Sequence, residues 1–269
     1  MRSRGLKRCI FWWVAAVALP LHAQERSAVT PLPRAHAHND YRHKRPLFDA
    51  LDHGFCSVEA DIFLVDGQLL VGHDRHELRG GRTLQQLYLD PLRRSVKENG
   101  GRVYPGGPTV MLLVDIKADG KAVYATLRDV LASYRDILCR VEDGRYRRGA
   151  VQVVISGDRP KEDIAADNPR FAAIDGRLSD LDSDAPPHLM PLISASWWSR
   201  FDWRGKGKFP PAQRDELRSI VESAHAAGRR VRFWATPETR ELWHELVAAG
   251  VDHLNTDHLD QLRDFLSNR

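Results

Sequence analysis

The segment from Phe55 to Asp74, FCSVEADIFLVDGQLLVGHD, carries the strongest indication of fold and site in the chain. Its first half is a short apolar run, typical of a strand that is buried on both faces. Asp66-Gly67 then predicts a tight turn, so the second half returns as the other strand of a hairpin. Glu59 and Asp61 lie two positions apart in the apolar run, so both carboxylates point to the same face. Burying two carboxylates is unfavourable without a cation, which marks this strand as part of a functional site.

Seven further short runs rich in apolar residues, several of them in Val and Ile, occur along the chain, and amphipathic helical patterns lie between them. Eight strand–helix units in about 250 residues predict a single (β/α)8 barrel, a TIM barrel of the α/β class. No break in composition divides the chain. The eight predicted strands are Pro33–His38, Phe55–Phe63, Thr109–Ile116, Ala150–Ser156, Ala172–Arg177, Pro191–Ser196, Arg230–Ala235 and Val251–Asn255.

Residues 1–23 have the pattern of a secretory signal peptide. Four basic residues precede a twelve-residue apolar run, Ile10–Leu21, and Ala23 supplies the small residue before the expected cut. The run is shorter than the roughly 20 residues that a membrane-spanning helix needs, although an uncleaved anchor is the alternative. We therefore expect export to the periplasm or the exterior after cleavage near Ala23. A leader would cover residues 24–32 and the barrel domain residues 33–269.

The net charge of +4 is confined to that N-terminal segment, because residues 1–23 contain four Arg and Lys but no Asp or Glu. The remaining chain has no excess of positive charge, so we expect no nucleic-acid partner. Hydrophobic residues make up 42% and charged residues 28%, which is typical of a soluble globular protein and argues against disorder. No motif indicates an obligate protein partner. Cys56 and Cys139, the cysteines beyond the signal, could pair after export or stay as buried thiols.

Polar residues gather at the ends of the predicted strands, where the active sites of such barrels lie. Asp115 ends the third strand, next to the strand that carries Glu59 and Asp61. Three converging carboxylates without a cysteine predict one hard divalent cation, Mg²⁺ or Ca²⁺. The alternative is a structural cluster in which Lys117 and an arginine neutralise the carboxylates.

Histidines from two segments flank these carboxylates. His36 and His38 end the first strand, and His73 follows the hairpin. Imidazole can donate and accept protons near neutral pH, so these three are candidate catalytic acid–base groups. We expect Asp40 or Asp74 to orient one of them.

Several motifs together resemble the glycerophosphodiester phosphodiesterase / phosphatidylinositol-specific phospholipase C superfamily. They are His36-x-His38-Asn39, Glu59-x-Asp61, His73-Asp74, Asp115-x-Lys117, and Gly250-Val251-Asp252 with Thr256-Asp257. The resemblance covers residues Ala35–Leu266 of this chain. The same motifs are also similar to those of sphingomyelinase D-type phospholipases. Three short motifs are most similar to the branch named after altered inheritance of mitochondria protein 6. They are His38-Asn39-Asp40-Tyr41, Arg232-Phe233-Trp234 and Asn255-Thr256-Asp257.

The resemblance implies metal-dependent cleavage of a phosphodiester by two histidines, in some members through a cyclic phosphate. It assigns the metal to Glu59, Asp61 and Asp115, and the proton transfers to His73 and a histidine of the first strand, with His38 favoured over His36. Many members carry an arginine after the first histidine, whereas Ala37 and Asn39 follow the histidines here. Arg177 or Arg159 is therefore the expected phosphate-binding arginine, and the substrate-binding residues are Lys117, Arg177, Trp234 and Asn39.

The expected substrate is a glycerophosphodiester or a phospholipid headgroup. The loop Trp197–Phe209 combines Trp with Arg and Lys, which is typical of peripheral membrane contact, but its aromatic residues could equally brace the barrel. Two other functions are open: an exported, non-catalytic protein that binds a phosphate headgroup, and an amidohydrolase-type metal hydrolase. The second is disfavoured because strands five and six end without the histidines that it needs.

Overall fold

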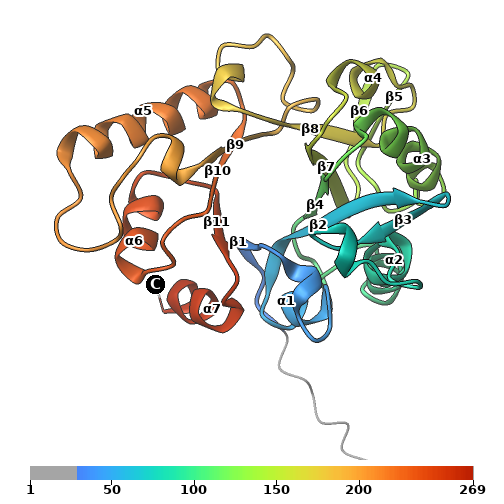
Figure 1. The fold of residues 1–269 in the computed structure, drawn as a ribbon, viewed down its shortest axis with the longest axis horizontal. Helices are drawn as coiled ribbons and strands as arrows, with labels where there is room; N and C mark the ends of the chain where they lie inside the picture. The colour runs from blue at the N-terminus through green and yellow to red at the C-terminus, as the bar shows by residue number, and fades with distance from the viewer. Residues whose placement is uncertain (1–28, 269) are drawn as a thin grey trace, which may run out of the picture.

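Eight parallel strands close into a barrel in the computed structural model, which describes residues 29–268 (Figure 1). They are β1 (Leu32–Ala37), β2 (Phe55–Val65), β4 (Val110–Ile116), β7 (Val151–Gly157), β8 (Ala172–Gly176), β9 (Leu192–Ser196), β10 (Arg230–Trp234) and β11 (His253–Thr256). Each strand pairs with the next in this order, and β1 closes the barrel by pairing with both β11 and β2. All eight predicted strands and the (β/α)8 fold are confirmed. The predicted signal peptide lies outside the described residues.

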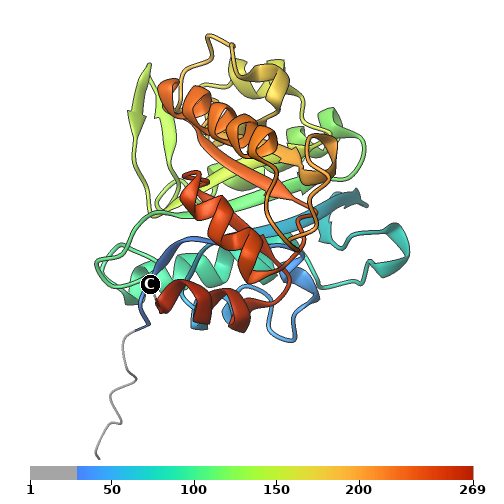
Figure 2. The same cartoon turned by 90° about the vertical axis from the view of Figure 1, so that its left-hand side faces the viewer.

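Two hairpins project from opposite ends of the barrel (Figure 2). The predicted one joins β2 to β3 (Gln68–Val71) through Asp66 and Gly67, both at positive φ. The other, β5 (Arg140–Glu142) with β6 (Arg145–Arg147), was not predicted, although Asp143-Gly144 carries the same turn signal. The first hairpin positions the site, because the Gly72 amide returns to donate to the Asp61 carbonyl (3.1 Å) and brings the next residue beside that strand.

The outer layer consists of helices that pack against the strands (Figures 1 and 2). They are α1 (Phe48–Asp52), α2 (Asp90–Glu98), α3 (Gly120–Ala132), α4 (Lys161–Ala166), α5 (Pro211–Ala226), α6 (Arg240–Ala248) and α7 (Leu259–Ser267). Most of the hydrophobic core lies between this layer and the barrel wall. No helix within residues 29–268 combines the length and apolar character needed to cross a bilayer.

One of the eight expected helices does not form. Between β8 and β9, residues 178–191 contain only the 3-10 turn Leu178–Asp180, because Pro186-Pro187 and several Asp and Ser residues disfavour a helix. Arg229, which is 2% exposed, holds this segment instead. Its guanidinium donates to the backbone carbonyls of Asp180, Leu181, Ser183 and Ala185. A single buried side chain thus satisfies carbonyls that a helix would have satisfied internally.

The interior of the barrel holds one small apolar cluster and many buried polar side chains, which include Ser156, Asp175 and Ser194. Strands β4, β7, β8 and β9 contribute a small apolar cluster, separate from the main core: Met111, Leu113, Val154, Ala173 and Leu192. Strands β1, β2, β10 and β11 contribute buried polar side chains, among them His36, Ser57, Glu59, Arg232, His253 and Asn255. Such barrels usually fill their interior with branched apolar residues, so this many buried polar side chains indicates function rather than packing.

Candidate active site

A cavity of about 470 Å³ opens at the C-terminal ends of the barrel strands. Every residue predicted for the site except His36 lines it, and the sequence reasoning missed Ser156 and Arg232 among its lining residues. The cavity therefore lies where the fold class predicts an active site.

The three predicted metal ligands converge at one wall of this cavity. Asp61 and Asp115 are direct partners in the β2–β4 ladder, and Glu59 lies two residues before Asp61. One oxygen from each carboxylate lies within 4.8 Å of the others. Gly157 leaves room for this arrangement, since a Cβ there would lie 2.2 Å from Asp115 Oδ1.

The donor set fits a hard divalent cation. Asp61 Oδ1 is buried and has no hydrogen-bond partner, and no side chain of residues 29–268 donates a hydrogen bond to the Asp115 carboxylate. Burial and then the charge of Glu59 raise the pKa of Asp61. Burial, and then Asp61 and Glu59, raise the pKa of Asp115 to about 7. Like charges are thus held together in a buried place, which a cation would stabilise.

Two basic side chains partly neutralise the cluster. Lys117 Nζ lies 3.2 Å from Asp61 Oδ2, and Arg232, which is almost fully buried, donates to Glu59. Burial lowers the pKa of Lys117, but Asp61 and Asp115 raise it by more, so its ammonium stays charged. The structural ion-pair interpretation therefore fits Glu59 and Asp61. Asp115 feels the charges of Lys117 and Arg232, but no basic side chain within residues 29–268 forms an ion pair with it.

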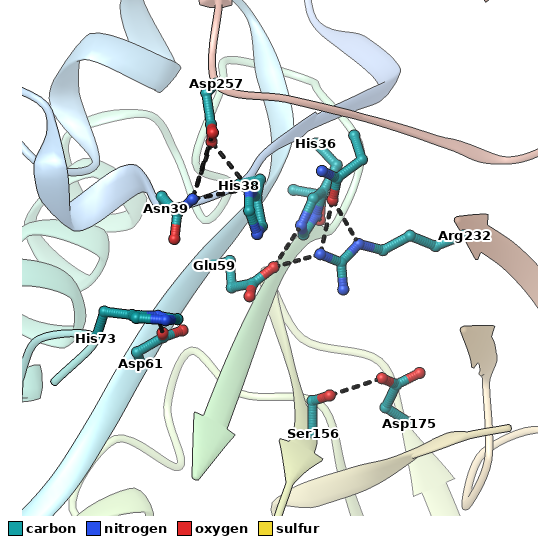
Figure 3. Close-up of polar contacts among 12 residues, drawn as sticks. His36, His38, Asn39, Glu59, Asp61, His73, Ser156, Asp175, Arg232 and Asp257 are labelled. Carbon is teal, nitrogen blue, oxygen red and sulfur yellow. Dashed lines mark hydrogen bonds and ion pairs between the residues drawn. The ribbon is translucent and has the colours of Figure 1, made fainter. Parts of the chain in front are cut away.

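His38 lines the cavity and is held by Asp257 (Figure 3). Its Nδ1 lies 2.9 Å from Asp257 Oδ1, and the Asn39 side chain donates to the same carboxylate oxygen over 3.2 Å. Burial lowers the pKa of His38, but the hydrogen bond to Asp257 and the charge of Glu59 outweigh it, so the net pKa lies above the usual 6.5. Asp257 belongs to the Thr256-Asp257 motif, and its role as the partner of His38 was not predicted from the sequence.

His73 approaches from the other segment, after β3. Its Nδ1 lies 2.8 Å from Asp61 Oδ2, which also accepts from the Tyr41 hydroxyl over 2.9 Å. The His73 backbone amide donates to Glu77 (2.8 Å) and fixes the turn. Because Nδ1 is engaged by Asp61, Nε2 is the ring nitrogen left for proton transfer.

His36 lies beneath the cavity rather than in its wall. The side chain is fully buried, with Nδ1 2.6 Å from Ser57 Oγ and Nε2 3.1 Å from Glu59 Oε2. Burial, followed by Arg232 and His38, lowers its pKa well below the usual value. The geometry makes His36 a support for Glu59 and leaves His38 as the first-strand histidine that can reach a substrate.

The predicted orienting residues for the histidines are wrong. Asp40 points away from the site and accepts from the Leu47 amide and the Tyr88 hydroxyl. Asp74 caps the short turn that follows His73. The partners are Asp257 and Asp61 instead, because chain neighbours on a strand end face different directions, whereas residues of adjacent strands meet.

Arg177 lines the far side of the cavity, and Arg159 does not. The Arg177 guanidinium donates to Asp175 Oδ2 (2.7 Å) and to Ser156 Oγ (3.2 Å). Ser156 in turn donates to the same Asp175 oxygen (2.8 Å), as Figure 3 shows. Of the two arginines that the sequence offered for phosphate binding, Arg177 is therefore the one that lines the cavity.

The aromatic loop mostly braces the barrel. Trp197 and Trp203 are buried, and the Trp197 indole donates to the Trp203 carbonyl (2.9 Å). Trp198 is 45% exposed and lies against Arg204, while Trp234 at the cavity mouth is 40% exposed. Cys56 and Cys139 are both buried free thiols, so they are not paired in this structure.

A (β/α)8 barrel that carries a carboxylate cluster, two carboxylate-held histidines and basic residues at its C-terminal rim is of the phosphodiesterase type. The chain belongs to the family described as AIM6-like phosphodiesterase domain, whose model matches residues 24–174. The model of the glycerophosphoryl diester phosphodiesterase family matches residues 230–260.

Named relatives agree with this assignment. Altered inheritance of mitochondria protein 6 from Eremothecium gossypii is 33% identical, over 88% of this chain and 70% of that protein. Its homolog from Arthroderma benhamiae is 29% identical, over 88% of this chain and 84% of that protein. The predicted superfamily and branch are confirmed.

Solved structures share the fold at low identity. A glycerophosphodiester phosphodiesterase from Parabacteroides distasonis superposes with a TM-score of 0.52 at 15% identity, covering 89% of this chain and 99% of that one. A calcium-dependent phosphoinositol-specific phospholipase C from a Pseudomonas species superposes with a TM-score of 0.54 at 11% identity. The match covers 85% of this chain and 90% of that one.

Proposed function

We propose that this protein is an exported, metal-dependent phosphodiesterase that cleaves a glycerophosphodiester or a phospholipid headgroup. The observation that supports this most directly is the pair His38 and His73. The two side chains come from different segments, line one cavity, and are each held by a carboxylate through Nδ1.

Glu59, Asp61 and Asp115 would hold one Mg²⁺ or Ca²⁺, which supplies Lewis-acid stabilisation of the phosphoryl oxygens when bound. Lys117 and Arg177 face the same cavity and would offset the charge that grows on those oxygens in the transition state. Asn39 and Trp234 would border the group attached to the phosphate, and exposed Trp198 would contact a lipid surface.

The proton transfers follow from the hydrogen bonds. Asp257 stabilises the protonated form of His38, so His38 would give its proton to the departing oxygen as the ester P–O bond breaks. Asp61 fixes the tautomer of His73, so its Nε2 would accept the proton of the attacking hydroxyl as the new P–O bond forms. An attacking hydroxyl on the substrate itself would give a cyclic phosphate.

A non-catalytic phosphate-binding protein is the second candidate, because Arg232 and Lys117 already pair with Glu59 and Asp61. The amidohydrolase interpretation has less support, since Asp175 and Ser196 stand near the ends of β8 and β9 and His36 lies off the cavity.

Phosphorus NMR of the chain with glycerophosphodiesters and lysolipids, with and without EDTA, tests the proposal. We expect a new resonance that EDTA abolishes and that Mg²⁺ or Ca²⁺ restores; its shift distinguishes a cyclic phosphate from a monoester. His73→Ala should remove the resonance, while His76→Ala, an exposed histidine of the same turn, should keep it. Broadened substrate signals without a product would support the binding protein instead.

A further inference from the structure

A second cavity, of about 500 Å³, lies at the opposite end of the barrel from the catalytic site. We call it the N-terminal cavity, because residues at or near the beginnings of strands line it, such as Arg34 of β1, Arg230 of β10 and His253 of β11. Tyr146 and Arg148 of the β5–β6 hairpin region also line it; Figure 2 shows that hairpin, in yellow-green, at the end away from β3. Neither the predicted activity nor the family resemblance uses these residues.

The charge in this cavity is unbalanced. Three guanidiniums, those of Arg34, Arg148 and Arg230, face one carboxylate, that of Asp252. Asp252 Oδ2 is already engaged by His225 Nε2 and the Val231 amide, each at 2.8 Å. The lining therefore carries two positive charges in excess, which suits a dianion.

Arg230 is the innermost of these cations and is poorly satisfied. Its guanidinium donates through Nη2 to Gln152 Oε1 over 2.6 Å and contacts the Met111 sulfur over 3.7 Å. Within residues 29–268, its Nε and Nη1 make no hydrogen bond to any acceptor. Burial lowers the pKa of Arg230, which means that its charge is held in an unfavourable place. Arg230 is half-buried, and a guanidinium largely withdrawn from water is normally paired, so its unused N–H groups indicate an anion as the partner.

His253 supplies an independent observation. It lines the cavity, is 3% exposed, and neither of its ring nitrogens has a hydrogen-bond partner among residues 29–268. Burial, and then the charge of Arg230, lower its pKa well below the usual value, so the ring is neutral and offers one N–H donor and one acceptor. Buried polar groups are almost always satisfied, so an orphaned imidazole beside an under-used guanidinium indicates a ligand.

We propose that the N-terminal cavity binds a small phosphate-type dianion, held by the guanidiniums of Arg230, Arg148 and Arg34 and by the imidazole of His253. Guanidinium matches the paired oxygens of phosphate in geometry as well as in charge. This site is separate from the proposed catalytic site and would exist even if the chain had no phosphodiesterase activity.

Inorganic phosphate, titrated calorimetrically into the metal-free full chain, is the test. Arg148→Gln removes an exposed cation of the cavity and should preserve the fold; Arg230→Gln removes the inner one. Each should weaken phosphate binding about tenfold, the loss expected for one charge-assisted hydrogen bond. Arg145→Gln is the matched control: Arg145 is an exposed arginine of β6, three residues before Arg148, that does not line the cavity, and the variant should bind as the parent does.

Lys117→Gln separates this site from the catalytic cavity, which would also attract phosphate. Binding that survives Lys117→Gln but weakens in Arg148→Gln and Arg230→Gln supports the proposal. No phosphate binding, binding unchanged by both arginine variants, or binding lost only in Lys117→Gln overturns it. Crystals soaked in tungstate should show an anomalous peak beside Arg230 and His253, and a peak confined to the catalytic cavity would also overturn it.

Discussion

His73 Nδ1 lies 2.8 Å from Asp61 Oδ2, while the other oxygen of the same carboxylate is buried without a partner. The carboxylate thus has one oxygen committed to orienting a histidine and one left for a ligand. One oxygen of Glu59, one of Asp61 and one of Asp115 also lie within 4.8 Å of one another. Asp61 would therefore both orient His73 and bind the proposed cation.

The cation should control stability as well as activity. We expect Mg²⁺ or Ca²⁺ to raise the melting temperature of the metal-free protein, because a ligand that binds only the folded state stabilises it by mass action. Saturation at about 100 times Kd corresponds to about 2.7 kcal/mol. Differential scanning calorimetry with each ion measures the shift. The same shift in Asp115→Asn would show that the ion binds elsewhere.

The pH dependence of stability follows from Asp115, whose pKa rises to about 7 in the folded state. The unfolded carboxyl has its ordinary pKa near 4, so between pH 4 and 7 the folded state holds a proton that the unfolded state has lost. Metal-free stability should therefore fall as the pH rises through this window. Asp115→Asn should flatten that part of the curve, as urea denaturation at several pH values would reveal. An equally steep fall in the variant would refute the role of Asp115.

Asp257 should set the pH range of activity through His38. The hydrogen bond to Asp257 raises the pKa of His38, so Asp257→Asn lowers it and reduces the protonated fraction above neutrality. If His38 is the general acid, the alkaline limb of the kcat/KM profile moves to lower pH. The shift is about one pH unit for each tenfold increase in the acid dissociation constant of His38. The pH–rate profile checks this. A uniform loss of rate at every pH would point to a structural role for Asp257.

Gly157 should be intolerant of any side chain. Its φ is +69°, and a Cβ would lie 2.2 Å from both Asp115 Oδ1 and the Ile116 carbonyl oxygen. Gly157→Ala should destabilise the protein by roughly 1–3 kcal/mol from backbone strain alone and should also displace Asp115. Gly67→Ala is the matched control, with φ +74° but no atom within 4 Å of the added Cβ. Equal melting temperatures and equal metal affinities in the two variants would contradict the steric argument.

Arg229 should be among the residues most important for stability. Arg229→Met leaves four backbone carbonyls of residues 180–185 without their donor, and the loss should reach about 3 kcal/mol or more. Arg218→Met, an exposed arginine of α5, should change stability by about 0.5 kcal/mol or less. Denaturant unfolding compares the two. A loss for Arg229→Met no larger than that for Arg218→Met would rule out its clamping role.

The sequence revealed the barrel because its strands are short apolar runs and its site residues stand at their ends. The carboxylates of β2 could be assigned from spacing alone, since alternation along a strand places Glu59 and Asp61 on one face. The partners of the histidines could not, because Asp257 is 219 residues away from His38 and meets it only when β11 pairs with β1. The missing helix after β8 was not predicted either, although Pro186-Pro187 gave a local reason to expect a loop.

The hairpin formed by β2 and β3 has a consequence for how this chain can change over evolution. Residues 55–77 supply Glu59, Asp61 and His73, so most of the proposed reaction chemistry sits in one covalently continuous piece. The loop after β8, by contrast, borders the cavity through Arg177, and the loop after β9 supplies none of the cavity's lining residues; neither contributes a carboxylate to the cluster. Apart from Arg177, which is proposed to face the phosphate, those loops can lengthen, shorten or exchange side chains without disturbing the carboxylate cluster. Asp257 and Arg232 hold His38 and Glu59 from the second half of the barrel, so selection for new substrates would act mainly on the loops after β8 and β9 rather than on the strand ends.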